Sequence, residues 1–142
     1  MQRYVIIAEG ASSLTERIKS YFIARGYRAT TVANALEGIE LIKSELPDVL
    51  VLDCALLWGG CDGVLDWLQA DPVGCRIPVV LMTEQSCPES HHPLVVRQMR
   101  RPFDVESLLQ AVNMAILPTE CESSSRLSPA KRDVFQPIMN GL

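Results

Sequence analysis

The sequence lacks the features that would place it in a membrane or outside the cell. Its 142 residues contain no apolar run close to the roughly 20 residues that cross a bilayer. The first residues, Met1-Gln2-Arg3, lead directly into an apolar segment, without the hydrophobic stretch of a signal peptide. We therefore expect a cytoplasmic protein with no membrane partner.

The chain also lacks an excess of positive charge. Thirteen Lys and Arg stand against 17 Asp and Glu, which gives a formal net charge of −4. The basic side chains are scattered, and only Arg97, Arg100 and Arg101 cluster. Because nucleic-acid binding depends largely on neutralising phosphates with cationic groups, we expect no direct nucleic-acid partner.

Motifs of common enzyme and metal sites are missing. The five cysteines include no CxxC pair and no histidine at zinc-finger spacing, which argues against a disulfide framework or a structural metal site. No GxGxxG follows the first apolar run, and no Ser/His/Asp or Cys/His set is evident. A flavodoxin-like redox protein and a small hydrolase are therefore disfavoured.

What the sequence does contain is an alternation of apolar runs and helical periodicity. Helices are expected after the caps Ser12 or Ser13, Asn34 and Asp104, and around Val64 to Leu68 before Asp71-Pro72. The segment 84–93 carries Pro88 and Pro93, so no regular helix is expected there. The apolar runs predict strands at 4–8, 27–32, 48–53, 79–82 and 94–99.

This alternation predicts an α/β domain with a parallel sheet and helices on both faces, because parallel strands need crossover connections. A length of 142 residues with 48% hydrophobic content suits one such domain. We expect that domain to span residues 1–118. Residues 119–142 are interpreted as a polar linker followed by a short tail helix that begins at Ser128-Pro129.

Chemistry-bearing residues fall where the predicted strands end. Asp53 closes the apolar run Val49 to Leu52, Glu9 follows the first run, and Thr83 follows the fourth. Ligands of open α/β sheets bind at the carboxyl ends of the strands. Glu9 and Asp53 together would attract a hard divalent cation such as Mg²⁺, while Thr83 and Arg101 would contact an anion beside Asp53.

In the order of these residues at the strand ends, residues 3–117 resemble a receiver domain of two-component response regulators. The resemblance rests on Asp53, Thr83, Asp62-Gly63 and Arg101-Pro102-Phe103. It implies a flavodoxin-like, doubly wound sheet of strand order 2-1-3-4-5, with the fourth helix short or absent in this chain. It also implies that Asp53 is the phosphoacceptor, that Thr83 contacts the phosphoryl group and that Arg101 stands in place of the family's lysine.

Three departures from the family's pattern affect the predicted site. Ala8 occupies the position of the first of two adjacent acids, so a Mg²⁺ site built from Glu9, Asp53 and the backbone carbonyl of Ala55 would be weakened. Arg101 replaces a lysine, and a guanidinium differs from an ammonium in length and geometry. Gln98 falls where the family's aromatic switch residue is expected, so coupling of Thr83 to an aromatic side chain is predicted to be absent.

Two functions therefore remain open. The chain is either an atypical receiver that acts in signal transduction as a protein-interaction module without phosphorylation, a pseudo-receiver, or a working receiver phosphorylated by a histidine kinase on Asp53 with Mg²⁺. Neither is an enzyme beyond self-phosphorylation and dephosphorylation at Asp53. The partner is a histidine kinase or another signalling protein, and a homodimer is also open.

Simpler structural roles are open for the same residues. Asp53 can be a buried acid paired with Arg101, whose guanidinium would fill the vacated metal site. Thr83 can cap the end of its strand, and Glu9 can be a solvated loop acid.

Overall fold

The computed structural model describes residues 2–10, 13–55, 60–83 and 91–116. The expectations for Pro88 and for the tail 119–142 concern residues outside these ranges. No helix in these ranges is long and apolar enough to cross a membrane. The elements are β1 (Tyr4–Ala8), α1 (Ser13–Ala24), β2 (Arg28–Val32), α2 (Ala35–Ser44), β3 (Val49–Asp53), α3 (Gly60–Ala70), the 3₁₀ turn η1 (Gly74–Arg76), β4 (Val79–Thr83), β5 (Val95–Arg100) and α4 (Val105–Ile116).

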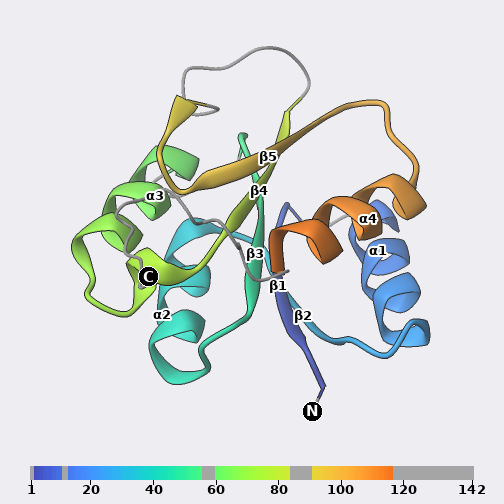
Figure 1. Cartoon of the computed structure of the whole chain (residues 1–142), viewed down its shortest axis with the longest axis horizontal. Coiled ribbons are helices and arrows are strands. Elements are labelled where there is room, and N and C mark those ends of the chain that lie inside the picture. The colour runs from blue at the N-terminus through green and yellow to red at the C-terminus, as the bar shows by residue number, and fades with distance from the viewer. Residues whose placement is uncertain (1, 11–12, 56–59, 84–90, 117–142) are drawn as a thin grey trace, which may run out of the picture.

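The five strands form one parallel sheet in the order β2-β1-β3-β4-β5, so the predicted flavodoxin-like topology is confirmed. Helices α1 and α4 lie on one face of the sheet and α2 and α3 on the other (Figure 1). The strand order reverses between β1 and β3. At such a point the two neighbouring crossovers lead to opposite faces and leave a crevice at the carboxyl ends of the strands.

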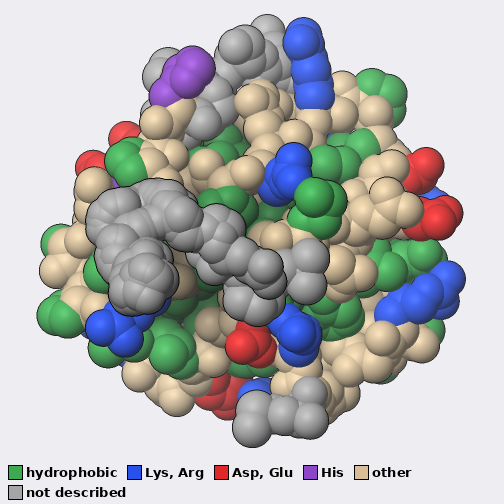
Figure 2. Space-filling view, viewed as in Figure 1, with side chains coloured by type: hydrophobic (Ala, Val, Ile, Leu, Met, Phe, Trp, Pro, Cys, Tyr) green, Lys and Arg blue, Asp and Glu red, His purple; other side chains and the backbone are tan. Residues whose placement is uncertain are grey.

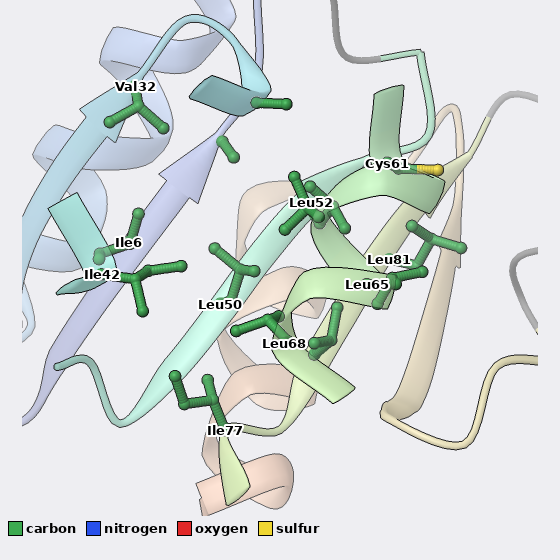
Figure 3. Packing of buried hydrophobic residues seen from close by; sticks show 14 of the residues in the cluster. Ile6, Val32, Ile42, Leu50, Leu52, Cys61, Leu65, Leu68, Ile77 and Leu81 are labelled. Atoms are coloured by element: carbon green, nitrogen blue, oxygen red, sulfur yellow. The ribbon is translucent and has the colours of Figure 1, made fainter. Parts of the chain in front are cut away.

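Two apolar clusters, one on each face of the sheet, form the core. Residues of β1, β3 and β4 alternate between them, as the period of two in a strand requires. Ile6, Leu50 and Leu81 pack with α2 and α3 (Figure 3), whereas Val5, Val51 and Val80 pack with α1 and α4. Strands buried on both faces explain why the sequence shows continuous apolar runs in place of polar alternation.

The helices begin at the side chains that cap them. Asn34 accepts a hydrogen bond from the Glu37 amide at 2.9 Å, and the Glu37 carboxylate accepts one from the Ala33 amide at 3.0 Å. Asp104 accepts one from the Ser107 amide at 2.7 Å, and hydrogen bonding to Ser107 lowers the pKa of Asp104. Helix α3 begins at Gly60, earlier than the apolar positions Val64 to Leu68 indicate, and Cys61 in its first turn is buried in the core.

Between β4 and β5, the described residues 91–94 form no α-helix, as expected, and residues 84–90 lie outside the described ranges. The pairing of β4 with β5 contains one irregularity. Val79 pairs with Val95 and Val80 with Arg97, so Val96 is an extra residue in β5. Figure 2 shows one face of the molecule, on which acidic, basic and apolar side chains are interspersed.

Gly26 lies in the connection between α1 and β2, and its backbone adopts the left-handed conformation, with φ of 93°. A Cβ atom at Gly26 would meet no other atom within 4 Å, so its cost would come from the backbone conformation alone. Gly63, within α3, has equally open space and no positive φ.

We therefore predict opposite effects for the same substitution at these two glycines. Gly26→Ala should lower the free energy of unfolding by about 1 kcal/mol, because alanine disfavours a positive φ. Gly63→Ala should raise it by about 0.5 to 1 kcal/mol, because alanine is the better helix former. Urea denaturation of the two variants measures both, and equal shifts would contradict the backbone explanation.

Candidate functional site

The site lies at the carboxyl ends of three adjacent strands. Glu9 follows β1, Asp53 ends β3 and Thr83 ends β4, so the strand order places these three residues next to one another along the edge of the sheet. Arg101 follows β5, and its backbone amide donates to the carbonyl of Thr83 at 2.7 Å. The structure thus gathers at one edge the residues that the sequence singled out.

A single guanidinium joins the two acids. Arg101 Nη2 lies 2.5 Å from Glu9 Oε2, and Arg101 Nη1 lies 3.4 Å from Asp53 Oδ1. The exposed fractions of the three side chains are 7% for Glu9, 13% for Asp53 and 19% for Arg101. Formally the cluster carries two negative charges and one positive charge. Because charges shielded from water interact strongly, loss of the cation would leave two carboxylates facing each other without compensation.

Glu9 is held from two sides. Its Oε1 accepts a hydrogen bond from the hydroxyl of Thr15 at 2.9 Å, while Oε2 meets Arg101. Glu9 is only 6% exposed, so the interpretation of Glu9 as a solvated loop acid is wrong. The sequence reasoning missed Thr15. The sequence feature that could have indicated Thr15 is a hydroxyl in the first turn of the helix that directly follows the strand carrying Glu9.

Asp53 has a second partner in its own loop. Its Oδ1 accepts a hydrogen bond from the backbone amide of Ala55 at 3.1 Å. This is a local Asp turn that orients the carboxylate at the end of β3. The amide of Ala55 therefore meets the carboxylate, whereas the sequence prediction involved its carbonyl as a metal ligand.

Thr83 is almost completely buried, with 1% exposure, and is bonded through both its backbone and its side chain. Its carbonyl accepts from Arg101, and its Oγ1 accepts a hydrogen bond from Gln98 Nε2 at 3.0 Å. No aromatic residue stands at position 98, yet Thr83 still has a side-chain partner on β5. The sequence reasoning missed this contact because it looked only for an aromatic ring.

The residues present do not fit a resident Mg²⁺ in this arrangement. Both carboxylates that would bind it are paired with Arg101, and Ala8 supplies no third one. Within the described ranges, no group of three or more His, Cys, Asp or Glu residues is placed to hold a metal ion. A hard cation needs several oxygen ligands, and here the donors of a guanidinium already meet these oxygens.

Because the three charged side chains of the cluster are shielded from water, removal of the Arg101 guanidinium should have a large effect on the free energy of unfolding. Arg101→Met should lower the free energy of unfolding by about 3 kcal/mol, because it leaves two shielded carboxylates unpaired. Arg101→Lys should cost less, since one charge remains. Chemical denaturation checks this, with Arg97→Met as the matched control: exposed Arg97 contacts only Met114 Sδ, at 3.5 Å, among the described hydrogen bonds.

Adding Asp53→Asn to Arg101→Met should restore part of the lost stability, because one of the two unpaired charges is then gone. If Arg101→Met were as stable as the Arg97→Met control, the ion pairs of Arg101 would not contribute to the free energy of unfolding, and the prediction would be wrong.

Comparison with known proteins places this geometry in context. No family model matches the chain. Protein Rrf1 of Nitratidesulfovibrio vulgaris is 29% identical over 119 residues, which cover 82% of this chain and 84% of Rrf1. Sporulation initiation phosphotransferase F of Bacillus subtilis is 23% identical over 116 residues, which cover 79% of this chain and 92% of the relative.

Solved structures match the fold over most of the chain. The receiver domain of a Luxo repressor protein from Vibrio parahaemolyticus superposes with a TM-score of 0.73 at 20% identity, covering 82% of this chain and 91% of that domain. The receiver domain of sensor histidine kinase PA1611 from Pseudomonas aeruginosa, with a magnesium ion in its active-site cleft, gives 0.72 at 18% identity, covering 82% and 98%. The predicted resemblance is thus confirmed: the chain has the fold of response-regulator receiver domains.

Proposed function

We propose that the chain is a signalling receiver that acts as a protein-interaction module without phosphorylation. The single observation that carries the proposal is the bridge from Arg101 to Glu9 and Asp53. In this arrangement Oδ1 of Asp53 accepts hydrogen bonds from both Arg101 and the Ala55 amide. The carboxylate that would attack a phosphodonor is therefore already paired with a cation from within the chain.

Arg101 does the electrostatic work that a metal ion would otherwise do. A guanidinium carries one charge, cannot lose its proton in proteins and presents two nitrogen atoms at the spacing of the two acids. To bind both carboxylates, Mg²⁺ would have to displace the guanidinium from them. This competition weakens the metal site. We therefore expect Glu9 and Asp53 to stay paired with Arg101, with no cofactor bound at this edge of the sheet.

The partner of such a module is another signalling protein, with a histidine kinase as one member of that class. This follows from the receiver fold and from the sequence relatives, which include a sporulation initiation phosphotransferase. A soluble domain of this kind in the cytoplasm, with no nucleic-acid contact of its own, agrees with the formal net charge of −4. Self-association of two copies is a further form that the interaction can take.

A second candidate, the working receiver, is favoured by a different observation. Asp53 and Thr83 end neighbouring strands, and Arg101 is joined to both of them through its side chain and its backbone. An anion on Asp53 would meet a hydroxyl and a positive charge. In this alternative, Arg101 would pair with the phosphoryl group on Asp53, and Glu9 and Asp53 would hold Mg²⁺, which would offset negative charge.

Incubation with acetyl phosphate and Mg²⁺, followed by intact-mass analysis, separates the two candidates. The wild type should gain no phosphoryl group, because Asp53 is occupied by Arg101. The double variant Ala8→Asp/Arg101→Lys, which restores the missing first acid and the lysine of the family, should gain one. Asp53→Ala in that background should abolish the gain and thereby locate the phosphoryl group.

The outcomes are distinct. A phosphoryl group on the wild type that disappears in Asp53→Ala would overturn the proposal in favour of the working receiver. A gain in the restored double variant alone would show that the fold supports the chemistry and that the residues at positions 8 and 101 block it. Calorimetric titration with Mg²⁺ should then give heat for the double variant and none for the wild type.

A further inference from the structure

A hollow of about 360 Å³ lies between the last turns of α2 and α3. Its apolar lining consists of Ile42, Leu46, Trp67 and Val73. Leu46 is 54% exposed and Val73 is 50% exposed, and Lys43 Nζ lies 5.9 Å from the centre of the Trp67 ring. This α2–α3 groove therefore leaves apolar side chains in water that a segment of protein can cover.

The groove lies at the edge of the sheet where the strands begin. Leu46 directly precedes β3, and Val73 precedes β4. The acid cluster of Glu9, Asp53 and Arg101 lies at the opposite edge, where the strands end. The groove is therefore a surface separate from the acid cluster.

The chain that follows α4 starts from the same edge as the groove. Helix α4 ends at Ile116, and Asn113 in its last turn accepts a hydrogen bond from the hydroxyl of Tyr27, which precedes β2. Residues 117–127 span at most about 36 Å when extended. The sheet and the helix layer on each of its faces are each about 10 Å thick. Residues beyond 127 can therefore reach the groove across the end of the sheet.

The segment 128–142 contains the apolar side chains that such a groove requires. Val134, Phe135, Ile138 and Met139 fall within six residues of one another. Covering apolar side chains of this size is favourable, because each one removes apolar surface from water. The segment thus supplies apolar area to match the exposed lining of the groove.

Charge favours the α2–α3 groove over the other face of the sheet. Helices α2 and α3 together carry four acidic residues and one lysine, whereas α1 and α4 carry two acidic and two basic residues. Residues 126–133 contain three basic residues and one acidic residue, so opposite charges meet on the α2–α3 side. The hollow between α1 and α4 has one aliphatic side chain in its lining, Val105. Apolar lining and charge thus select the same groove.

We propose that residues 128–142 dock in the α2–α3 groove of their own chain. The apolar side chains of this segment cover the exposed lining of the groove, and its basic side chains lie toward the acids of α2 and α3. The docking surface is at the edge of the sheet opposite the acid cluster. The proposal therefore goes beyond the proposed function and does not rest on it.

Cleavage by chymotrypsin after Phe135 tests the docking in the full chain. The measured quantity is a protection factor, the cleavage rate of a synthetic peptide of residues 128–142 divided by that of the chain. When docking and release are fast, cleavage follows the population of the undocked segment. The wild type should have a protection factor of about 10 or more, because a short flexible linker gives the segment a local concentration in the millimolar range.

Two valines of equal exposure provide a matched pair of variants. Val73 in the groove is 50% exposed, and Val96 in β5 is 49% exposed. Val73→Ser should lower the protection factor by about 5-fold, which corresponds to the burial of half a valine side chain. Val96→Ser should leave the protection factor unchanged. Ile138→Ser, compared with a peptide that carries the same substitution, should also lower it, and this variant changes none of the described residues.

Three outcomes would overturn the proposal. A wild-type chain cut as fast as the peptide would mean that the segment is undocked. Equal effects of Val73→Ser and Val96→Ser would mean that the segment docks elsewhere. A protection factor that rises with protein concentration would mean that the segment docks on a second copy of the chain.

Discussion

The site depends on one guanidinium that is shared by two shielded carboxylates. Arg101 cannot be moved or removed without leaving Glu9 and Asp53 close together and uncompensated. Everything else at this edge supports that arrangement. Thr15 holds the far oxygen of Glu9, and the Ala55 amide holds Asp53. Both oxygens of Glu9 and Oδ1 of Asp53 are thus bonded within the chain, which leaves fewer oxygens to offer to a metal ion or a phosphodonor.

The fold supplies this arrangement through strand order alone. Three strands that end side by side present their last residues together, and the connection after β5 returns Arg101 to them. The same topology that lets ordinary receivers assemble a phosphorylation site can therefore assemble an internal ion pair. We propose that the choice between the two outcomes depends on a small number of side chains at fixed positions, chiefly Ala8 and Arg101.

Much of the fold could be predicted from the sequence, because its signals are local. Continuous apolar runs identified buried strands, and Asn34 and Asp104 identified helix starts by their capping chemistry. The site was harder to predict. Position in the strand order indicated that Asp53 and Arg101 would be neighbours, but not that Glu9 would be buried. Burial of Glu9 depends on how α1 packs over the strand end, a tertiary contact that no local pattern encodes.

The Gln98 contact shows a second limit. A family pattern directs attention to the residue type that it expects, so a polar residue in place of an aromatic one was interpreted as a loss. Hydrogen-bonding capacity is visible in the sequence, but its use depends on the register between β4 and β5. That register contains an extra residue, which a reading of β5 by itself cannot reveal.

The extra residue Val96 has a consequence for how this molecule behaves in concentrated solution. β5 is one of the two edge strands of the sheet, and edge strands invite pairing with strands of other molecules. A bulge distorts the repeat of donors and acceptors that an incoming strand would need, and Arg97 and Arg100 add like charges along it. The strand can therefore lie at the border of the sheet and still resist growth into ordered aggregates.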